Sequence, residues 1–435
     1  MRGMKALSDF DYAELRVENG TETSVRVINN EVKTNSGKYK GISVRVLENG
    51  SWGFAASNTD TSISELLKKA EKLAKLESGK ISVKKTKKIK RTVKDKIVSS
   101  KQEEIVGKLL EARKHMEGKE IISKSLACSD SVVEKEFYNS EGVEIHQKIG
   151  YTYLSCSDIA RSGALVQRGS ETEASRDGFG KIDVFHAAEV AKEKAERLLR
   201  AELAPKGVFT VVLDPEMTGV LSHEAIGHAS EADSIVDRES ILANKMGKKI
   251  GSELVNIVDD PTAKNFGLLR YDEEGVKARK TNLITKGVVS GFLNSRETAK
   301  ELGVKSNGHA RAASYDSVPI VRMTNTYFLP GKTSVEDVFD IRKGIYLKGM
   351  RGGSVDTFSG GFMFKAEEAQ EIKNGECGAI LRDVTISGNI LETLKHVVLV
   401  GKDFGTSPGM CGKMGQEAPV SDGGPHIQVK KMKIG

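Results

Sequence analysis

The sequence is poor in cysteine and has no long apolar run. Its four cysteines, Cys128, Cys156, Cys377 and Cys411, are spread through 435 residues without a paired framework. A disulfide-stabilised secreted domain is therefore not expected, and we predict free thiols in a reducing cytoplasm. No segment approaches the roughly 18 apolar residues that a membrane span needs, and the first residues lack the apolar core of a signal peptide. We therefore expect no membrane association.

Acidic and basic residues nearly balance. The chain has 67 Lys and Arg against 60 Asp and Glu, a net charge of +7. Much of the excess lies in one stretch, KKTKKIKRTVKDK, from Lys84 to Lys96. Because this stretch has no interleaved aromatic residues and matches no recognition motif, a solvated linker or an edge strand is favoured over a nucleic-acid contact.

The first 205 residues mix strand-like and helix-like patterns. Apolar and polar residues alternate near the N-terminus, and the Asn-Gly pair at 49–50 between two such runs is a strong hairpin signal. Ser62 and Glu65 form a capping box before one predicted helix, and Ser100 and Glu103 form another before a second helix. The predicted strands cover 12–18, 22–29, 40–48, 51–57, 131–138 and 143–155, and predicted helices cover 62–73, 100–110 and 183–204.

The pattern changes at Pro205, which interrupts the third helix. A short apolar strand, VFTVVLDP, follows, and then glycine-rich stretches with little helical periodicity except near 334–340. We therefore predict an α+β fold, with an N-terminal α/β region over 1–205 that has an antiparallel sheet and flanking helices. A β-rich domain over 206–435 follows, and it contains His223 and His228. The repeated helix and meander suggest two related units, 1–80 and 100–205.

The segment LSHEAIGH places His223 and His228 five residues apart, with Glu224 directly after the first. Zinc peptidases usually have two helical histidines four apart, with the glutamate beside the metal. Four residues advance roughly 40° past a full helical turn, whereas five advance roughly 140° past it. One metal therefore requires a π-helical distortion, which Gly227 could allow. The alternative is two histidines on a solvated helix.

A third ligand is needed to favour the metal site. Cys411, in the glycine-flanked segment GMCGKMG, is a candidate in an exposed loop, and His426 in the same C-terminal segment is a competing candidate. The alternative for Cys411 is a structural, buried cysteine. Two histidines and one thiolate would leave a tetrahedral zinc with one open position.

Other polar segments have structural interpretations. Residues 271–275, YDEEG, are typical of a turn whose acids are structural, and His309 is a lone histidine of the structural kind. Gly352 and Gly353 belong to a glycine-rich run without the ending of a phosphate loop. We interpret the run as β-structure to which an extended substrate could add as a strand.

Several motifs together resemble the TldD/PmbA family of metallopeptidases: HEAIGHASEAD, YDEEGVKARKTNLITKGVVSGFL, SNGHAR, RMTNTYFLPG, GIYLKGMRGGSVDTFSGGFMF and PGMCGKMGQ. They cover nearly all of residues 206–435. The TldD-type subunit of that family carries HExxxH and a late cysteine, so this chain resembles that type. The resemblance implies dimers that enclose a chamber, often heterodimers with a PmbA/TldE-type subunit, and proteolysis of small or unfolded peptides.

The resemblance and the chemistry assign the same roles. His223, His228 and Cys411 are expected to hold Zn²⁺, and Glu224 is the expected general base for the attacking water. Glu231 and Asp233 are further candidates, which could orient His228. The sequence leaves two alternative functions open. One is a non-catalytic binding partner or modulator, and the other is a zinc amide hydrolase that acts on a non-peptide substrate.

Overall fold

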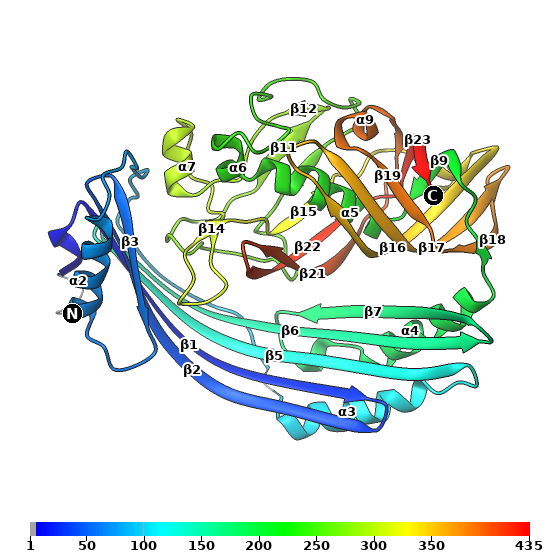
Figure 1. The fold of residues 1–435 in the computed structure, drawn as a ribbon, viewed down its shortest axis with the longest axis horizontal. Coiled ribbons are helices and arrows are strands. Elements are labelled where there is room, and N and C mark those ends of the chain that lie inside the picture. Colours follow the sequence, from blue (N-terminus) through cyan, green and yellow to red (C-terminus); the bar gives the residue numbers. More distant parts are fainter. Residues whose placement is uncertain (1–5, 99) are drawn as a thin grey trace.

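A computed structural model describes residues 6–98 and 100–435. The short helix η1 (Ala6–Asp9) precedes a seven-stranded sheet. Its strands follow the order β3-β2-β1-β5-β6, and β4 and β7 both pair with β6. Figure 1 shows the long strands curving beneath the rest of the molecule. The strands are β1 (Tyr12–Ile28), β2 (Glu31–Glu48), β3 (Ser51–Ser57), β4 (Ile89–Lys94), β5 (Ile121–Asn139), β6 (Val143–Ser162) and β7 (Leu165–Ser175).

The strands are longer than the sequence pattern indicated. Residues 12–18 and 22–29 were predicted as two strands, but they form the single strand β1. Gly20 does not end it, because the ring of Tyr39 covers this position, and a Cβ there would lie 2.2 Å from Tyr39 Cε1. The predicted hairpin turn is confirmed, with φ values of 52° at Asn49 and 71° at Gly50.

Two of the three N-terminal helices begin where predicted. Helix α2 (Ile63–Ala74) has Ser62 as its N-cap, whose side chain accepts a hydrogen bond from Glu65 N. Helix α3 (Gln102–His115) follows Lys101, which makes no capping bond, so the predicted cap at Ser100 is wrong. Helix α4 (Val184–Leu199) is capped by Asp183 and ends at Leu199, before residue 204, because residues 202–203 form strand β8.

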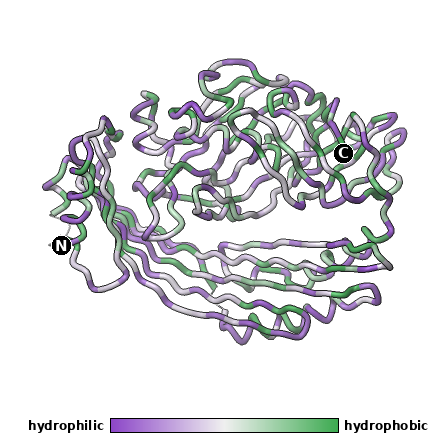
Figure 2. Tube along the Cα trace, in the orientation of Figure 1, coloured by the Kyte–Doolittle hydropathy of each residue, from purple (hydrophilic) through white to green (hydrophobic). Residues whose placement is uncertain are grey.

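Both faces of the long sheet are covered. Helices α3 and α4 pack on an apolar side that includes Val25 and Leu126. The other side carries buried charges, with Glu14, Arg16 and Glu18 exposed by only 1%, 6% and 5%. Figure 2 shows hydrophilic and hydrophobic residues interspersed along these strands. The charged side is buried because the C-terminal part of the chain lies over it (Figure 1).

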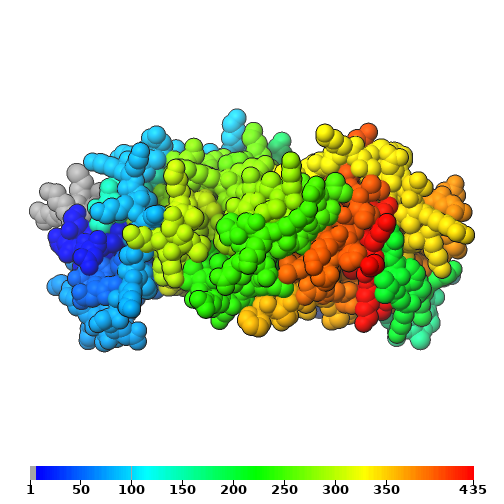
Figure 3. Space-filling view, turned by 90° about the horizontal axis from the view of Figure 1, so that it is seen from above, coloured from blue at the N-terminus to red at the C-terminus, as the bar shows by residue number. Residues whose placement is uncertain are grey.

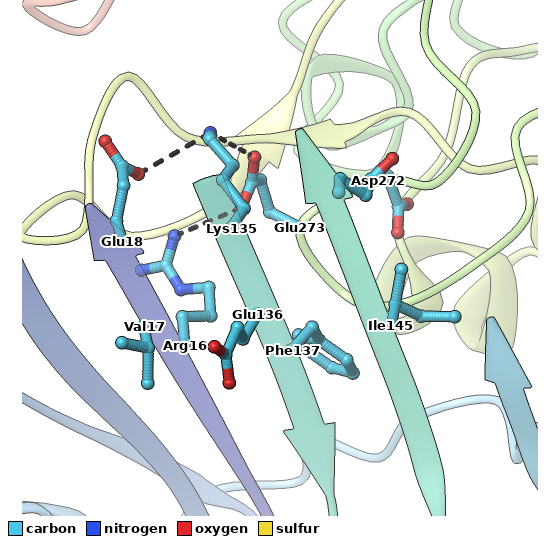
Figure 4. A pocket seen from close by; sticks show the side chains of 10 residues that line it. Arg16, Val17, Glu18, Lys135, Glu136, Phe137, Ile145, Asp272 and Glu273 are labelled. Atoms are coloured by element: carbon cyan, nitrogen blue, oxygen red, sulfur yellow. Dashed lines mark hydrogen bonds and ion pairs between the residues drawn. The ribbon is translucent and has the colours of Figure 1, made fainter. Parts of the chain in front are cut away.

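Ion pairs join the sheet to the turn at 271–275. Arg45 Nη2 lies 2.7 Å from Glu274 Oε1, and Lys135 Nζ lies 2.7 Å from Glu273 Oε1 and 3.6 Å from Glu18 Oε2. Figure 4 shows Lys135 between these two carboxylates, with Arg16 beside them. The prediction that the acids of this turn are structural is confirmed by these contacts. Since these charges pair across the two layers, removing one partner would leave a buried charge uncompensated.

The C-terminal part contains two larger sheets and a two-stranded one. The eight-stranded sheet has the order β16-β9-β23-β19-β17-β18-β8, with β20 beside β23. Its strands are β8 (Glu202–Leu203), β9 (Gly207–Leu213), β16 (Lys343–Val355), β17 (Gly361–Lys373), β18 (Glu376–Arg382), β19 (Thr385–Asn389), β20 (Val397–Val400) and β23 (Ile427–Ile434).

The six-stranded sheet has the order β12-β11-β10-β15-β22-β21. Its strands are β10 (Ile257–Asp259), β11 (Thr281–Thr285), β12 (Val288–Val289), β15 (Asn325–Phe328), β21 (Gly405–Lys413) and β22 (Gln416–Gly424). Separately, β13 (Ala310–Arg311) pairs with β14 (Ile320–Val321).

Short helices connect the strands of the C-terminal part. They are α5 (Pro215–Val220), η3 (Leu221–Gly227), η4 (His228–Ser230), α6 (Ala232–Val236), α7 (Arg296–Glu301), α8 (Val335–Phe339) and α9 (Ile390–Lys395). In the N-terminal part, η2 (Phe179–Lys181) precedes α4.

The predicted α+β class is confirmed by this mixture of sheets and helices. Seen from above, the first described residues lie at one end of an elongated molecule and the C-terminal residues lie toward the other end (Figure 3). The lysine-rich stretch contains β4, a strand at the end of the sheet order, as predicted. No helix within 6–98 and 100–435 has both the length and the apolar character needed to cross a membrane. We propose a domain boundary near residue 205, since the long sheet ends before it.

Candidate metal centre

A helical segment follows β9 directly and carries both histidines. Asp214 caps α5 by accepting a hydrogen bond from Met217 N at 2.7 Å, and Pro215 lies in the first turn. The helix continues from α5 into η3, which is a π-helix over Leu221–Gly227. The predicted π-helical distortion is therefore confirmed. The wider turn brings residues five apart to the same side.

The role that we predicted for Gly227 is wrong. Its φ of −56° and ψ of −61° are helical and open to any residue, so backbone freedom is not what this position needs. A Cβ at Gly227 would lie 1.9 Å from Met323 Sδ. The glycine therefore allows Met323, which is fully buried, to pack against the helix backbone.

Three side chains converge beside this π-helix. Cys411 Sγ lies 3.2 Å from His223 Nε2 and 3.4 Å from His228 Nε2. The three donor atoms lie within 4.8 Å of one another. His223 and Cys411 are exposed by only 5% and 6%, and the His228 side chain by 16%. Two imidazole nitrogens and one sulfur are donors that zinc accepts, and the donor set fits such an ion.

Cys411 reaches the histidines from a strand, which corrects the predicted exposed loop. It lies inside β21, where it pairs with Ala418 of β22, and it is buried. Arg322 Nη2 donates a hydrogen bond to the Cys411 carbonyl oxygen. β22 pairs in parallel with β15, which fixes the hairpin in the six-stranded sheet. The cysteine is therefore held by sheet pairing on one side and by a buried guanidinium on the other.

The three side chains strongly perturb one another's protonation. Burial raises the pKa of the Cys411 thiol, but hydrogen bonds and charge from His223 and His228 outweigh burial and lower this pKa to about 4. Burial lowers the pKa of each histidine, yet the contact with Cys411 raises both pKa values above the usual range. The cluster therefore favours the thiolate, which is the form of cysteine that binds metals.

Glu224 lies beside the three donors without joining them. Its Oε2 atom is 4.0 Å from His228 Nε2, beyond hydrogen-bond distance, and its side chain is 28% exposed. The donor cluster within the described residues consists of the two histidines and the cysteine alone. A carboxylate at this distance can reach the cluster through one water molecule, which is the geometry that a general base requires.

The two acids after His228 differ in their contacts. Glu231 Oε2 lies 3.2 Å from His228 Nδ1, and Glu231 is only 2% exposed. Asp233 pairs with Lys413, with Nζ and Oδ2 2.7 Å apart, and the same Nζ lies 3.1 Å from Glu231 Oε2. Burial raises the pKa of Glu231, but His228 and Lys413 together lower it below its usual value. Glu231 therefore occupies the predicted orienting position, whereas Asp233 contacts a lysine.

The competing ligand, His426, lies outside the cluster. Its Nδ1 atom is 2.7 Å from Asp403 Oδ2, and its Nε2 atom is 2.9 Å from the Tyr346 hydroxyl. His309 is fully buried, and its Nε2 atom lies 3.0 Å from Asp259 Oδ1, which fits the structural role predicted for it. Both histidines are thus engaged with partners in the fold.

The two glycines proposed for substrate binding lie on a strand edge. Gly352 and Gly353 pair with Lys365 and Phe364 of β17. On its other edge β16 pairs with β9, and this pairing covers only Ile345–Leu347. Gly352 has a φ of 131°, a conformation that favours glycine. Neither glycine belongs to the donor cluster.

The sequence contained no signal for a further acid, Asp422. It lies on β22 four residues after Ala418, the partner of Cys411, and therefore on the same face. Burial raises the pKa of Asp422 to about 7, opposed by the charge of His223 and aided by those of Glu224 and Cys411. A single acid within a strand has no local sequence pattern that reveals such a neighbourhood.

Domain models of one family match most of the chain: PmbA/TldA metallopeptidase domain 1 over residues 13–76, the central domain over 54–200 and the C-terminal domain over 206–435. A solved structure of TldE from Thermococcus kodakarensis has the same fold, with a TM-score of 0.80 and 24% identity, and the match covers 99% of each chain.

Curated relatives of the chain are named metalloproteases. A metalloprotease of Methanothermobacter thermautotrophicus is 40% identical over 437 aligned residues, which cover 98% of this chain and 95% of that protein. A protein of Saccharolobus solfataricus named zinc metalloprotease TldD homolog is 33% identical, covering 98% and 96% of the two chains. The chain therefore belongs to the PmbA/TldA family of metallopeptidases and is a metalloprotease related to the TldD homologs.

Proposed function

We propose that this protein is a zinc-dependent peptidase in which His223, His228 and Cys411 hold the metal. The observation that carries the proposal is the convergence of these three donors within 4.8 Å from two segments far apart in the chain. The name of the Saccharolobus solfataricus relative supports zinc as the metal. Zinc in such a site supplies a Lewis acid that polarises a carbonyl and makes water more acidic.

The side chains around the donors have separate tasks in this proposal. Glu224 takes a proton from the attacking water and then delivers it to the departing amine. Its partial exposure lets it reach both water and substrate. Glu231 accepts a hydrogen bond from His228 Nδ1–H, which leaves the lone pair on Nε2 of that ring, 3.4 Å from Cys411 Sγ, free to bind a metal.

The substrate of this proposal is a small or unfolded peptide in extended form. At Gly352 and Gly353, β9 does not cover the outer edge of β16, because its pairing ends at Leu347. A peptide could add there as a strand through main-chain hydrogen bonds. We further propose that the protein acts in the cytoplasm as a dimer, either with itself or with a TldE-type subunit, whose fold it shares.

The test is an unbiased peptide-library digest with wild type and Glu224→Gln, each with and without a chelator. We expect Glu224→Gln to lose about 100- to 10,000-fold in turnover, the usual contribution of a general base. It should keep one zinc per chain, because Glu224 is not among the clustered donors. Glu239→Gln, which makes the same change at an exposed acid, should behave as wild type.

Two outcomes would contradict these roles. Loss of zinc in Glu224→Gln would show that Glu224 is a ligand. Wild-type cleavage that persists after complete removal of zinc would show that the metal has no part in the reaction. Cleavage of non-peptide amides but of no peptide in the library would transfer the proposal to another substrate class.

A further inference from the structure

Lys413 connects the strand that carries Cys411 to the carboxylate behind His228. Its Nζ atom lies 3.1 Å from Glu231 Oε2, the same oxygen that lies 3.2 Å from His228 Nδ1. The opposite side of the His228 ring faces Cys411, with Nε2 3.4 Å from Sγ. Contacts therefore form a closed ring from Cys411 through His228 and Glu231 to Lys413.

Strand β21 links the two ends of this ring of contacts, because it carries both Cys411 and Lys413. Cys411 and Lys413 are two residues apart in β21, so their side chains leave the strand on the same face. Lys413 also reaches Asp233 Oδ2 at 2.7 Å and the Val321 carbonyl oxygen at 3.2 Å. Its side chain is only 15% exposed. One strand thus supplies both a donor to the cluster and the cation that neutralises the acids behind it.

The burial of Glu231 makes this cation important. Glu231 is 2% exposed, and within the described residues its Oε1 atom has no hydrogen-bond partner. Its other oxygen contacts His228 and Lys413. A buried carboxylate that loses its cation is an uncompensated charge, and moving the side chain toward water would relieve the cost. That movement would release the His228 ring from its present orientation.

We propose that Lys413 is a positioning residue for the metal centre: it holds Glu231 against His228 and thereby fixes the ring that faces Cys411. The inference rests on the proposed zinc site and extends it by a residue that contacts none of the three donors directly. Removing a side chain that orients a metal ligand usually lowers metal affinity by about 10- to 100-fold. We expect a loss of zinc affinity in this range for Lys413→Met.

Zinc affinity of the full-length protein, measured by competition with a chromophoric chelator, tests the proposal. Lys413→Arg keeps the charge and its donors and should retain most of the affinity. Lys402→Met changes an exposed lysine just before the same strand and should match wild type. The Co²⁺-substituted proteins provide a second readout. The thiolate-to-cobalt absorption should be altered in Lys413→Met and unchanged in Lys402→Met.

A double variant separates positioning from general support of the hairpin. If Lys413 acts through Glu231, then Lys413→Met should cost little further zinc affinity in a Glu231→Gln background. Equal losses in both backgrounds, or a lower melting temperature with wild-type affinity, would overturn the proposal. Absence of stoichiometric zinc binding in the wild type would instead refute the proposed metal site itself.

Discussion

Replacing Gly219 with Ala should weaken the candidate metal centre without changing any of its donors. Gly219 lies in α5, four residues before His223, where the helix packs against β22. A Cβ at this position would lie 2.4 Å from Gly423 N and 2.6 Å from Asp422 Oδ1. Because β22 pairs with β21, which carries Cys411, a wider gap between helix and strand moves His223 away from Cys411.

The size of the effect follows from this contact. Non-bonded heavy atoms need about 3.5 Å, so the helix and the strand backbone must separate by about 1 Å. Ligand sets tolerate deviations of only about 0.2 Å, and a misplacement of about 1 Å can cost about 100-fold in rate. Overpacking of this kind also costs about 1–3 kcal/mol of folding free energy. Since the obstacle is main chain, a rotamer change cannot relieve it.

The assay compares zinc per chain after dialysis against a mild chelator, peptide turnover and melting temperature. Gly107→Ala is the matched control, because Gly107 lies in α3 and nothing lies within 4 Å of a Cβ built there. The control should keep its zinc and gain up to about 1 kcal/mol from helix propensity. Wild-type zinc content, turnover and melting temperature in Gly219→Ala would refute the reasoning.

Three further predictions concern the ligand set, the pH dependence of stability and the substrate edge. Cys411→Ser should lose zinc during dialysis against a mild chelator while His426→Ala keeps it, and the reverse result would show that the wrong third ligand was chosen. Burial raises the pKa of Asp158 from 3.8 to about 7, so its neutral form stabilises the fold below pH 4 and this contribution is lost as the pH rises through 7. Asp158→Asn should therefore have a higher melting temperature than wild type at pH 8, with a gain in folding free energy of at most about 4 kcal/mol, and the two proteins should match at pH 4. An equal difference at both pH values would contradict the assignment. Gly352→Val with Gly353→Val should abolish peptide cleavage while zinc stays bound, and unaltered cleavage would remove the strand-addition idea.

Local signals in the sequence predicted the features that depend on neighbouring residues. The cap at Ser62 and the turn at Asn49-Gly50 follow from hydrogen bonds and backbone angles within four residues, and both are confirmed. The five-residue spacing of the histidines required a π-helix for one shared site, and the structure contains it. These predictions succeeded because few alternatives satisfy such short-range constraints.

Burial was harder to predict from the sequence. Alternation along β1 cannot show that Glu14, Arg16 and Glu18 are buried, because the partners that neutralise them include Glu273 and Arg45 from distant segments. Gly20 would end a strand on local criteria, yet the ring of Tyr39 covers it. In both cases the side chain that decides the outcome comes from another segment of the chain.

The candidate metal centre also has features that the sequence predicts and features that only the fold decides. The sequence by itself determined which residue types are available: two histidines at a π-helical spacing, an acid beside the first, and a late cysteine. Only the tertiary structure decided that Cys411 lies inside a paired strand, that His426 lies elsewhere, and that Lys413 stands behind Glu231. The physical reason is that hydrogen-bond pairing of β21 with β22 sets the face of each side chain. The packing of α5 on β22 then sets the distance between the two halves of the site.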